Sequence, residues 1–595
     1  MEIKKLSIMF IRTKTTPNSP RKSVQIVENV RDAQGKVKQK IVRYVGISHS
    51  DSEELKLRAL AMEIIAKMKC DEEVNSPQMS MVSNLSEYEI IKGLENKSKA
   101  GRKAKSRIED ILPVSQVTLD MVEEESRIID GVHEVAGHIY DEIGYSNILS
   151  NKKYNNILKD LVLCRISNPT SKLATSKSLN RYYMKEHDLD SIYRTMDRVF
   201  EKIGTIQSAT FMATQSLMGG EIEIILFDVT TLHFESVEAD NLRKFGYSKN
   251  FRFNTTQIVL ALATNKDGLP IGYELFEGNK AEVKTLIDSI DCWKEKFVIG
   301  KVCFIGDRAM FSADNLKQLE LRGYQYIVAA KLRTLPDFMI DKIWDENNYK
   351  PININNALTW AKEISYDPAD LGPLKKLKKY QELVKENEGR RILVTYNSKR
   401  ARHDAKHRES LLEKITKQLD KTTNSAKLIS NSSLKKYTSN TGKASSYIDQ
   451  SKIDIDAKWD GFHGVITNIS ESESSNSHII SSYRNLVKIE DCFRVNKTTL
   501  KMRPIYHFKE ERIRAHIAIC YMAFSVIRQL EYRVKLLKKL SIASIIEELN
   551  SVQSSIFVHK RTKDKYRVPG NFSNQARSIY AAIGIKRNLD AHPII

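Results

Sequence analysis

Residues 219–333 carry the pattern that most restricts how this chain can fold. Short apolar runs typical of buried strands alternate here with amphipathic stretches typical of helices. The first run, EIEIILFDV, follows Gly219 and Gly220, and the next two runs are joined at Asp267-Gly268, a dipeptide that favours a hairpin turn. The predicted order is strand, strand, strand, helix, strand, helix, strand. This order indicates a mixed α/β sheet covered by helices.

The whole chain is too long for a single hydrophobic core. At roughly 100–200 residues per domain, 595 residues predict several units. Lys and Arg total 95 against 74 Asp and Glu, a difference of +21, which favours a polyanionic partner such as nucleic acid. Hydrophobic residues at 41% exclude wholesale disorder.

Cysteine and hydropathy patterns restrict the setting. The six cysteines are scattered without a C-x-x-C pair, which argues against a disulfide scaffold or a Cys-rich zinc module and fits a reducing compartment. No apolar run approaches about 18 residues, and the first residues lack a secretory cleavage pattern, so we expect a soluble protein inside the cell.

The chain changes character several times. Helical periodicity with many Lys and Arg runs from Glu123 to Met218, which suits a DNA-binding module, although an ordinary helical domain would show the same pattern. Residues 97–107 read as a basic linker or arm, and 422–446 form a polar tract. We expect six regions: a small N-terminal β region (1–50), a mainly helical DNA-binding region (51–218), the first part of the core (219–333), a basic insertion (334–458), the second part of the core (459–530) and a C-terminal helical, basic tail (531–595).

Two acids follow apolar strands of the predicted sheet. Asp228 comes at the polar end of IILFDVTT, and Asp307 comes at the end of VCFIGDRAM. A carboxylate beside an apolar strand is costly to bury unless it is paired or metal-bound. Acids at strand ends of such a sheet point toward the crevice where ligands bind. A turn or capping role is the alternative for each acid alone.

A third acid, Glu490, belongs to a stretch that predicts one helix over 482–500. Tyr483, Glu490 and Lys497 are spaced seven residues apart, so at about 100° per residue they share one face. Arg494 flanks that face. Such a face can bring a carboxylate to a metal while the cation and tyrosine meet phosphate, but a solvated face would read the same way.

Taken together, these residues resemble the DDE transposases of bacterial insertion sequences. The resemblance rests on D-V-T at Asp228, I-G-D-R-A-M-F-S at Asp307, and a Tyr, Glu and Lys spaced as in the subgroup that has a strand-rich insertion before the Glu. It extends from about Glu221 to Gln529 and includes the blocks LPIGYELFEGN and RPIYHFKEERIRAHIAICYMAF. One position departs: the signature Arg of that helix is Leu486 here, and Arg494 is the candidate to replace it.

The resemblance implies an RNase H-like core in which Asp228, Asp307 and Glu490 are catalytic and hold two Mg²⁺ ions, with Mn²⁺ able to substitute. It implies in-line displacement at phosphorus without a covalent protein–DNA intermediate. Contacts to DNA are expected from side chains around the acids: Thr230, Arg308, Tyr483, Arg494 and Lys497. A structural salt bridge is the alternative for Arg308.

The function so implied is that of an insertion-sequence transposase. It would bind terminal inverted repeats, cleave the DNA ends and transfer them to target DNA as a synaptic homodimer, in the bacterial cytoplasm on the nucleoid and away from membranes. A catalytically silent, transposase-derived DNA-binding regulator and a metal-dependent DNA nuclease are the alternatives. The sequence contains no G-x-x-x-x-G-K-[ST], G-x-S-x-G or H-E-x-x-H motif, so no nucleotide-binding loop, serine-hydrolase or zinc-protease motif indicates another function.

Four further residues have two possible roles. Trp344 and Trp360, in the insertion, predict core packing, with base stacking as the alternative. Arg512 and His516 lie four apart on a predicted helix, where packing and a functional role are both open.

Overall fold

A computed structural model describes most of the chain. The chain divides into two compact units. The described residues are 9–15, 22–31, 37–48, 57, 58, 61, 65, 114 and 117–594, apart from 221, 236–237, 247–254, 298–301, 355–356, 367–375, 420–435 and 442–444. One unit comprises 1–123, 558–566 and 592–595, and the other comprises 124–557 and 567–591. The predicted basic stretch at 97–107 and much of the polar tract at 422–446 lie outside the described residues.

The N-terminal unit contains the small β region that the sequence predicts. Strands β1 (Met9–Thr15), β2 (Lys22–Arg31) and β3 (Val37–Ser48) form an antiparallel sheet in the order β1-β2-β3. Val24, Ile26 and Val45 are buried together on one face of it.

The larger unit is built on a nine-stranded sheet in the order β10-β11-β12-β15-β9-β8-β5-β6-β7. Strands β5 (Ile224–His233), β6 (Gln257–Asn265) and β7 (Pro270–Glu277) are antiparallel neighbours. Strand β8 (Cys303–Gly306) runs parallel to β5, and β9 (Gln325–Ala329) runs parallel to β8.

Two helices connect these strands in the predicted order. Helix α8 (Thr285–Lys296) precedes β8, and α9 (Ala313–Leu321) lies between β8 and β9, beginning at the predicted N-cap Ser312. Among the five strands β5 to β9, the first in sequence, β5, therefore lies at the centre, with β8 on one side and β6 on the other. This order confirms the RNase H-like arrangement.

The basic insertion extends this sheet. Strands β10 (Lys350–Ile354), β11 (Ala357–Ser365) and β12 (Arg391–Tyr396) are antiparallel neighbours, and β12 pairs with β15 (Phe462–Thr467), which pairs with β9. The remaining described elements of the insertion are α10 (Asp337–Trp344), α11 (Lys378–Glu386), α12 (Ser398–Leu419), β13 (Thr438–Thr441), β14 (Ser445–Ile448) and α14 (Gln450–Ala457). Trp344 and Trp360 are both exposed, so their predicted core packing is wrong.

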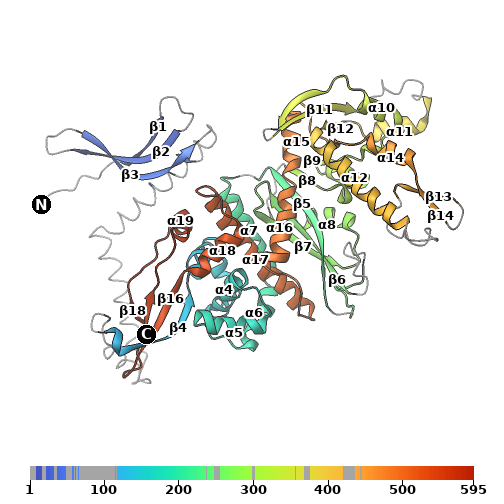
Figure 1. Ribbon diagram of the computed structural model, residues 1–595. Helices are drawn as coiled ribbons and strands as arrows, with labels where there is room; N and C mark the ends of the chain where they lie inside the picture. The colour runs from blue at the N-terminus through green and yellow to red at the C-terminus, as the bar shows by residue number, and fades with distance from the viewer. Residues whose placement is uncertain are drawn as a thin grey trace. The chain divides into compact units, whose positions relative to one another are not determined.

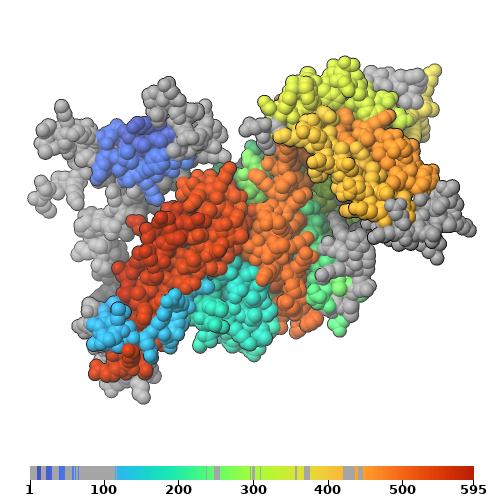
Figure 2. Space-filling model, viewed as in Figure 1, coloured from blue at the N-terminus to red at the C-terminus, as the bar shows by residue number. Residues whose placement is uncertain are grey.

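Helices form the other part of the larger unit. They are α3 (Gly137–Glu142), α4 (Lys152–Ser167), α5 (Lys172–Tyr183), α6 (Leu189–Phe200), α7 (Ile203–Leu217), α17 (Glu510–Lys535), α18 (Ile542–Ser551) and α19 (Asn574–Ile583). Helix α17 is buried over most of its length and packs against α4, α6, α7 and α19 (Figure 1). Segments from the two ends of this unit thus lie side by side, as Figure 2 shows.

One strand departs from the predicted helical stretch. Residues Val122–Ile129 form β4, which neighbours β16 (Gln553–His559) in a small sheet. Pairing with a distant strand overrides the local helix preference of the three consecutive Glu residues. Strands β17 (Lys565–Pro569) and β18 (His592–Ile594) come near the end of the chain. No helix in the described ranges is long and apolar enough to cross a membrane.

Candidate active site

The two predicted aspartates lie side by side where β8 ends. Asp307 follows the last residue of β8 as predicted, but the prediction that Asp228 ends its strand is wrong, because β5 continues to His233 through its pairing with β6. In the parallel pair β5–β8, Phe227 is opposite Gly306, so the residues that follow, Asp228 and Asp307, are neighbours. Each carboxylate accepts a hydrogen bond from the next backbone N–H, at 2.7 Å from Val229 and 2.6 Å from Arg308. This places two acids where the sequence predicts a ligand-binding crevice.

Gly306 allows this close approach of the end of β8 to β5. A Cβ at that position would lie 2.5 Å from the ring of Phe311 and 2.9 Å from the carbonyl oxygen of Phe227. A side chain there would therefore push β8 away from β5 and separate the two aspartates.

An open pocket of about 570 Å³ adjoins Asp307. Its lining includes Arg308, Lys331, His463 and Tyr483. Arg308 is exposed and makes no ion pair with any residue that the structure describes, so the alternative of a structural salt bridge is not observed. The pocket therefore places cations beside a carboxylate, an arrangement that suits a phosphate bound through a metal.

The charges of both Asp307 and Glu490 affect the pKa of the Tyr483 hydroxyl. Burial raises the pKa of Tyr483 to about 12, the charges of Asp307 and Glu490 add to this rise, and the charge of Arg400 opposes it. The Tyr483 ring packs on His463 at 5.2 Å between centroids. Burial, with the charges of Arg400 and Arg484, lowers the pKa of His463 to about 4, so this imidazole is neutral near pH 7. Tyr483 thus links the second aspartate electrostatically to the predicted glutamate.

Glu490 is exposed on α16 (Val487–Arg494), which packs against β5. The ammonium of Lys497 donates a hydrogen bond to the hydroxyl of Thr230. Thr230 is two residues beyond Asp228 and so lies on the same side of β5. This contact joins the segment that carries Glu490 to the strand that carries Asp228.

The single helix predicted over 482–500 is wrong. The structure has α15 (Asn476–Arg484), a turn at 485–486, α16, and a π-helical turn, η10 (Val495–Thr499). At the break, Leu486 N–H bonds to the carbonyl of Tyr483, and Ile489 N–H bonds to that of Leu486, a tighter three-residue spacing. Asn485 at the break is a weak helix former.

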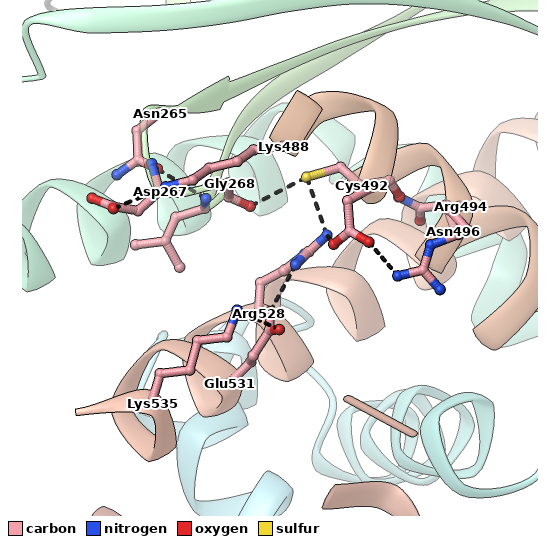
Figure 3. A network of polar contacts seen from close by, with 12 residues as sticks. Asn265, Asp267, Gly268, Lys488, Cys492, Arg494, Asn496, Arg528, Glu531 and Lys535 are labelled. Carbon is pink, nitrogen blue, oxygen red and sulfur yellow. Dashed lines mark hydrogen bonds and ion pairs between the residues drawn. The ribbon is translucent and has the colours of Figure 1, made fainter. Parts of the chain in front are cut away.

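A buried polar network holds the side of α16 that faces away from Glu490 (Figure 3). Arg528, 4% exposed, donates to Asp491 at 2.6 Å and to Glu531 at 2.7 Å. Cys492, about 200° around the helix from Glu490, donates its thiol to the carbonyl of Gly268 at 3.5 Å.

Two further contacts complete this network. Lys488 pairs with Asp267 at 3.5 Å, so the β6–β7 turn is tied to the same helix. Burial raises the pKa of Asp491, but the hydrogen bonds and charges of Arg528 and Arg494 outweigh it and hold that pKa below its ordinary value. Asp491 is therefore charged, and its bond to Arg528 and that of Lys488 to Asp267 hold α16 in place.

Arg494, the candidate for the vacant Arg position, belongs to this network. Its guanidinium pairs with Asp491, and its side chain is 67% exposed. Leu486 itself packs against the hydrophobic core. Arg484, the other arginine nearby in sequence, donates to the carbonyl of Ile354 and the hydroxyl of Thr359 in the insertion strands.

Arg400 is a cation near Tyr483 and His463 that the sequence does not single out. It lies in the first turn of α12, where its N–H and that of Lys399 are capped by the side chain of Asn397. The N–H of Asn397 bonds to the carbonyl of Gly461, two residues before His463. In the sequence, Asn397 just before the basic run KRARHDAKHR is the signal of a helix start that would place Arg400 in a first turn.

The donor set suits a hard divalent cation, because Asp228, Asp307 and Glu490 offer carboxylate oxygens. Within the described ranges, however, no three His, Cys, Asp or Glu side chains are gathered closely enough to hold a metal ion. The two aspartates are adjacent, and Glu490 is brought toward them on a separate element.

Comparison with known proteins gives two family matches. Residues 219–526 match the model of the transposase DDE domain, and residues 11–73 match that of the N-terminal domain of the IS1634 family transposases. No curated protein matches the sequence. The cryo-EM structure of a piggyBac transposase synaptic complex with hairpin DNA is similar at 11% identity and a TM-score of 0.34, over 71% of this chain and 77% of that one, and at this level it adds nothing to the assignment.

The DDE-domain match spans more than half of the 595 residues and contains all three predicted acids. The N-terminal match coincides with the small antiparallel β region. The chain belongs to the DDE transposases of insertion sequences.

Proposed function

We propose that this transposase cleaves DNA at the ends of its element and joins those ends to target DNA, with Asp228, Asp307 and Glu490 as metal ligands. The observation that carries the proposal is the pairing of β5 with β8, which makes the two aspartates neighbours, together with the Lys497–Thr230 hydrogen bond that ties the Glu490 segment to β5. All three acids fall within the matched DDE domain.

Two Mg²⁺ ions, or Mn²⁺ in their place, are the proposed cofactors. When bound, they would activate the attacking hydroxyl or water and stabilise the leaving oxygen. Asp228 and Asp307 can each keep one carboxylate oxygen on a backbone N–H and turn the other toward a cation. Glu490, exposed on α16, would supply the third carboxylate to these cations.

The cations around the pocket would position the DNA. Arg308 and Lys331 line the space next to Asp307, and we propose that they contact phosphates of the strand being cut. Lys497 and Thr230 would hold a phosphate on the Glu490 side. Arg494 remains a candidate for a peripheral DNA contact, because most of its side chain is exposed.

We further propose that Arg400 takes the part of the Arg missing at Leu486. Arg400 acts on both Tyr483 and His463, and it is half exposed, with a loose 3.8 Å contact to Asp404. A guanidinium in this position can reach a phosphate held over Tyr483. The insertion would then contribute directly to the active site.

Recognition of the inverted repeats is proposed for the N-terminal β region and the helical region that precedes β5. Assembly as a homodimer on two DNA ends is also a proposal, as is the place of action, the cytoplasm and its nucleoid. Sedimentation of the protein with a duplex that carries one element end would test the assembly, since two chains and two duplexes should travel together.

Single substitutions of the acids test the proposed chemistry. Asp228→Asn, Asp307→Asn and Glu490→Gln should each retain binding to end DNA, and each should lower Mg²⁺-dependent cleavage by about 10³-fold or more, because each removes a metal ligand. Asp314→Asn, an exposed acid in the first turn of α9, is the matched control and should cleave normally.

The same assay separates the alternatives. Near-normal cleavage by any of the three acid variants would overturn the proposal. Binding without cleavage by the unaltered protein would identify a silent regulator. Cut ends without joined products would identify a nuclease.

A further inference from the structure

A second cationic pocket lies in the helical part of the larger unit. Its inner part has a volume of about 80 Å³ and opens into an outer part of about 620 Å³. The inner wall comes from the end of α4, the start of α5, the segment 501–507 and α17. The residues that matter are Arg165, Lys172, Lys501, Arg503, His507 and His516.

The cations at the base of this pocket have no acidic partner. Lys172 is 4% exposed and Arg165 is 5% exposed, yet neither forms an ion pair with a carboxylate in the described part of the chain. The only hydrogen-bond contact of the Lys172 ammonium there is Nδ1 of His516, at 3.5 Å. The imidazole of His516 bonds through Nε2 to the carbonyl of Met502 at 3.0 Å, which leaves Nδ1 as the acceptor.

Nearby carboxylates do not relieve this excess charge. Asp197 on α6 is held by Arg512 at 2.8 and 3.0 Å. Burial, followed by the charge of Arg165, lowers the pKa of Lys172 to about 7, and burial with the charges of Lys172, Arg512 and Arg165 lowers that of His507 to about 3. The pocket thus costs the folded protein electrostatic energy that an anion would offset.

The backbone of α5 adds to the attraction for an anion. This helix of 12 residues begins at the pocket, with Ser171 as its N-cap, and Thr170, Ser171 and Lys172 line both the inner and the outer part. The N-terminus of a helix carries a partial positive charge and unpaired N–H groups. Two buried, unpaired cations and a helix start therefore converge on one space.

Exposed aromatic and apolar side chains surround the mouth. Tyr506, Phe508 and Leu173 are exposed, and Tyr506 and Leu173 line the outer part. Exposed rings next to phosphate-binding cations are typical of surfaces that bind nucleic acid, since bases stack on them. The segment 501–508 also begins four residues after Lys497, so this pocket and the proposed active site share one stretch of chain.

We propose that this pocket is a phosphate-binding site that holds one backbone phosphate of the DNA, with Lys172 and Arg165 as buried ligands and Lys501 and Arg503 at the rim. The choice of DNA over a free phosphate rests on the proposed function and on the exposed aromatic rim. The site holds the strand by its backbone, so it does not distinguish base sequence.

Binding without catalysis tests this site separately from the chemistry. Lys172→Met, measured on a duplex in EDTA, should weaken binding about tenfold on every sequence and lower the slope of log K against log salt by about one. Lys501→Gln, at the exposed rim, should act in the same direction with a smaller effect and cannot disturb the core. Lys538→Gln, an exposed lysine outside the pocket lining, is the control and should bind as the unaltered protein does.

Inorganic phosphate supplies the second arm. It should raise the melting temperature of the unaltered protein and leave that of Lys172→Met unchanged. Unchanged DNA affinity and salt slope in both pocket variants would overturn the proposal, and so would a phosphate effect without any change in DNA binding, which would assign the pocket to a free phosphate compound. Loss of cleavage in the acid variants bears on the active site alone, because these binding measurements need no metal.

Discussion

Two groups of buried cations in the larger unit differ in one respect, the presence of carboxylates. Arg528 sits between Asp491 and Glu531, and the three residues bind α16 to α17. Lys172 and Arg165 are buried to the same degree, but no carboxylate of the described residues lines their pocket. Their neighbours there are each other and two histidines, His507 and His516. A buried charge that is paired in the chain supports structure, whereas a buried charge left unpaired is explained by a ligand from outside.

The largest effect on stability is expected at the paired cation. Arg528→Met would remove the buried cation shared by Asp491 and Glu531, which would keep only the exposed partners Arg494 and Lys535, so we expect a loss of about 3 kcal/mol in the free energy of unfolding, measured in urea. Cleavage should fall as well, since α16 positions Glu490. A loss below about 1 kcal/mol would show that the network is dispensable and would remove the contrast between the two groups.

The unpaired cation should respond with the opposite sign. Lys172→Met removes a buried charge that has no partner, so the free energy of unfolding should rise by about 1–3 kcal/mol near pH 6. A loss of stability of similar size would mean that Lys172 supports the fold.

The gain should also depend on pH. The pKa of Lys172 is lowered to about 7 in the folded chain, against its ordinary 10.5, so between these values the unfolded state holds the proton and the folded state does not. The stability of the unaltered protein should therefore rise with pH through this window relative to Lys172→Met. The difference in urea midpoint between the two proteins at about pH 6 and about pH 9 measures it.

The groups that face Lys172 support this assignment of the pH dependence. Burial raises the pKa of Cys164 to about 11 and that of Cys520 above its ordinary value, and burial lowers the pKa of His507 and His516. The two thiols ionise inside this window when the chain is unfolded, but they do so in both proteins, so the difference between the unaltered protein and Lys172→Met isolates the ammonium. A pH-independent difference would contradict the burial of an unpaired ammonium.

The smallest effect is expected at the exposed edge of the paired group. Arg494→Ala should change the free energy of unfolding by less than about 1 kcal/mol, because Arg528 still holds Asp491 and an exposed pair contributes little. Urea unfolding beside Arg528→Met gives the comparison. A large loss of free energy of unfolding in Arg494→Ala would mean that Arg494, and not Arg528, is the main stabilising partner of Asp491.

Local sequence patterns predicted the central sheet well. The runs around Asp228, Asp267 and Asp307 are continuous strands or turns, so their order and the position of Asp307 after a strand could be inferred without tertiary information. The length of β5 beyond Asp228 could not, because it depends on pairing with β6. The break at Asn485 could not, because each half of that stretch has helical periodicity and the turn depends on what α15 and α16 pack against. Strand β4 was missed for the same reason, since its pairing partner comes more than 400 residues later.

Residues that act through distant partners were hidden in the sequence. The charge of Arg400 acts on Tyr483 because β12, which precedes α12, pairs with β15, and Lys172 contacts His516 across 344 positions of chain. Their neighbours in sequence are ordinary basic and polar residues, so the local sequence gives neither Arg400 nor Lys172 a distinguishing pattern.

The way the insertion joins the sheet affects what can be removed from this protein. Strand β15 has β12 on one side and β9 on the other, so it is an interior strand only while the insertion is present. Deleting the insertion would turn β15 into an open edge with unpaired backbone groups, the kind of surface on which sheets from different molecules join and aggregate. The insertion therefore covers an edge of the sheet as well as extending it, and a shortened enzyme would need another protection for that edge, such as a charged residue or a proline.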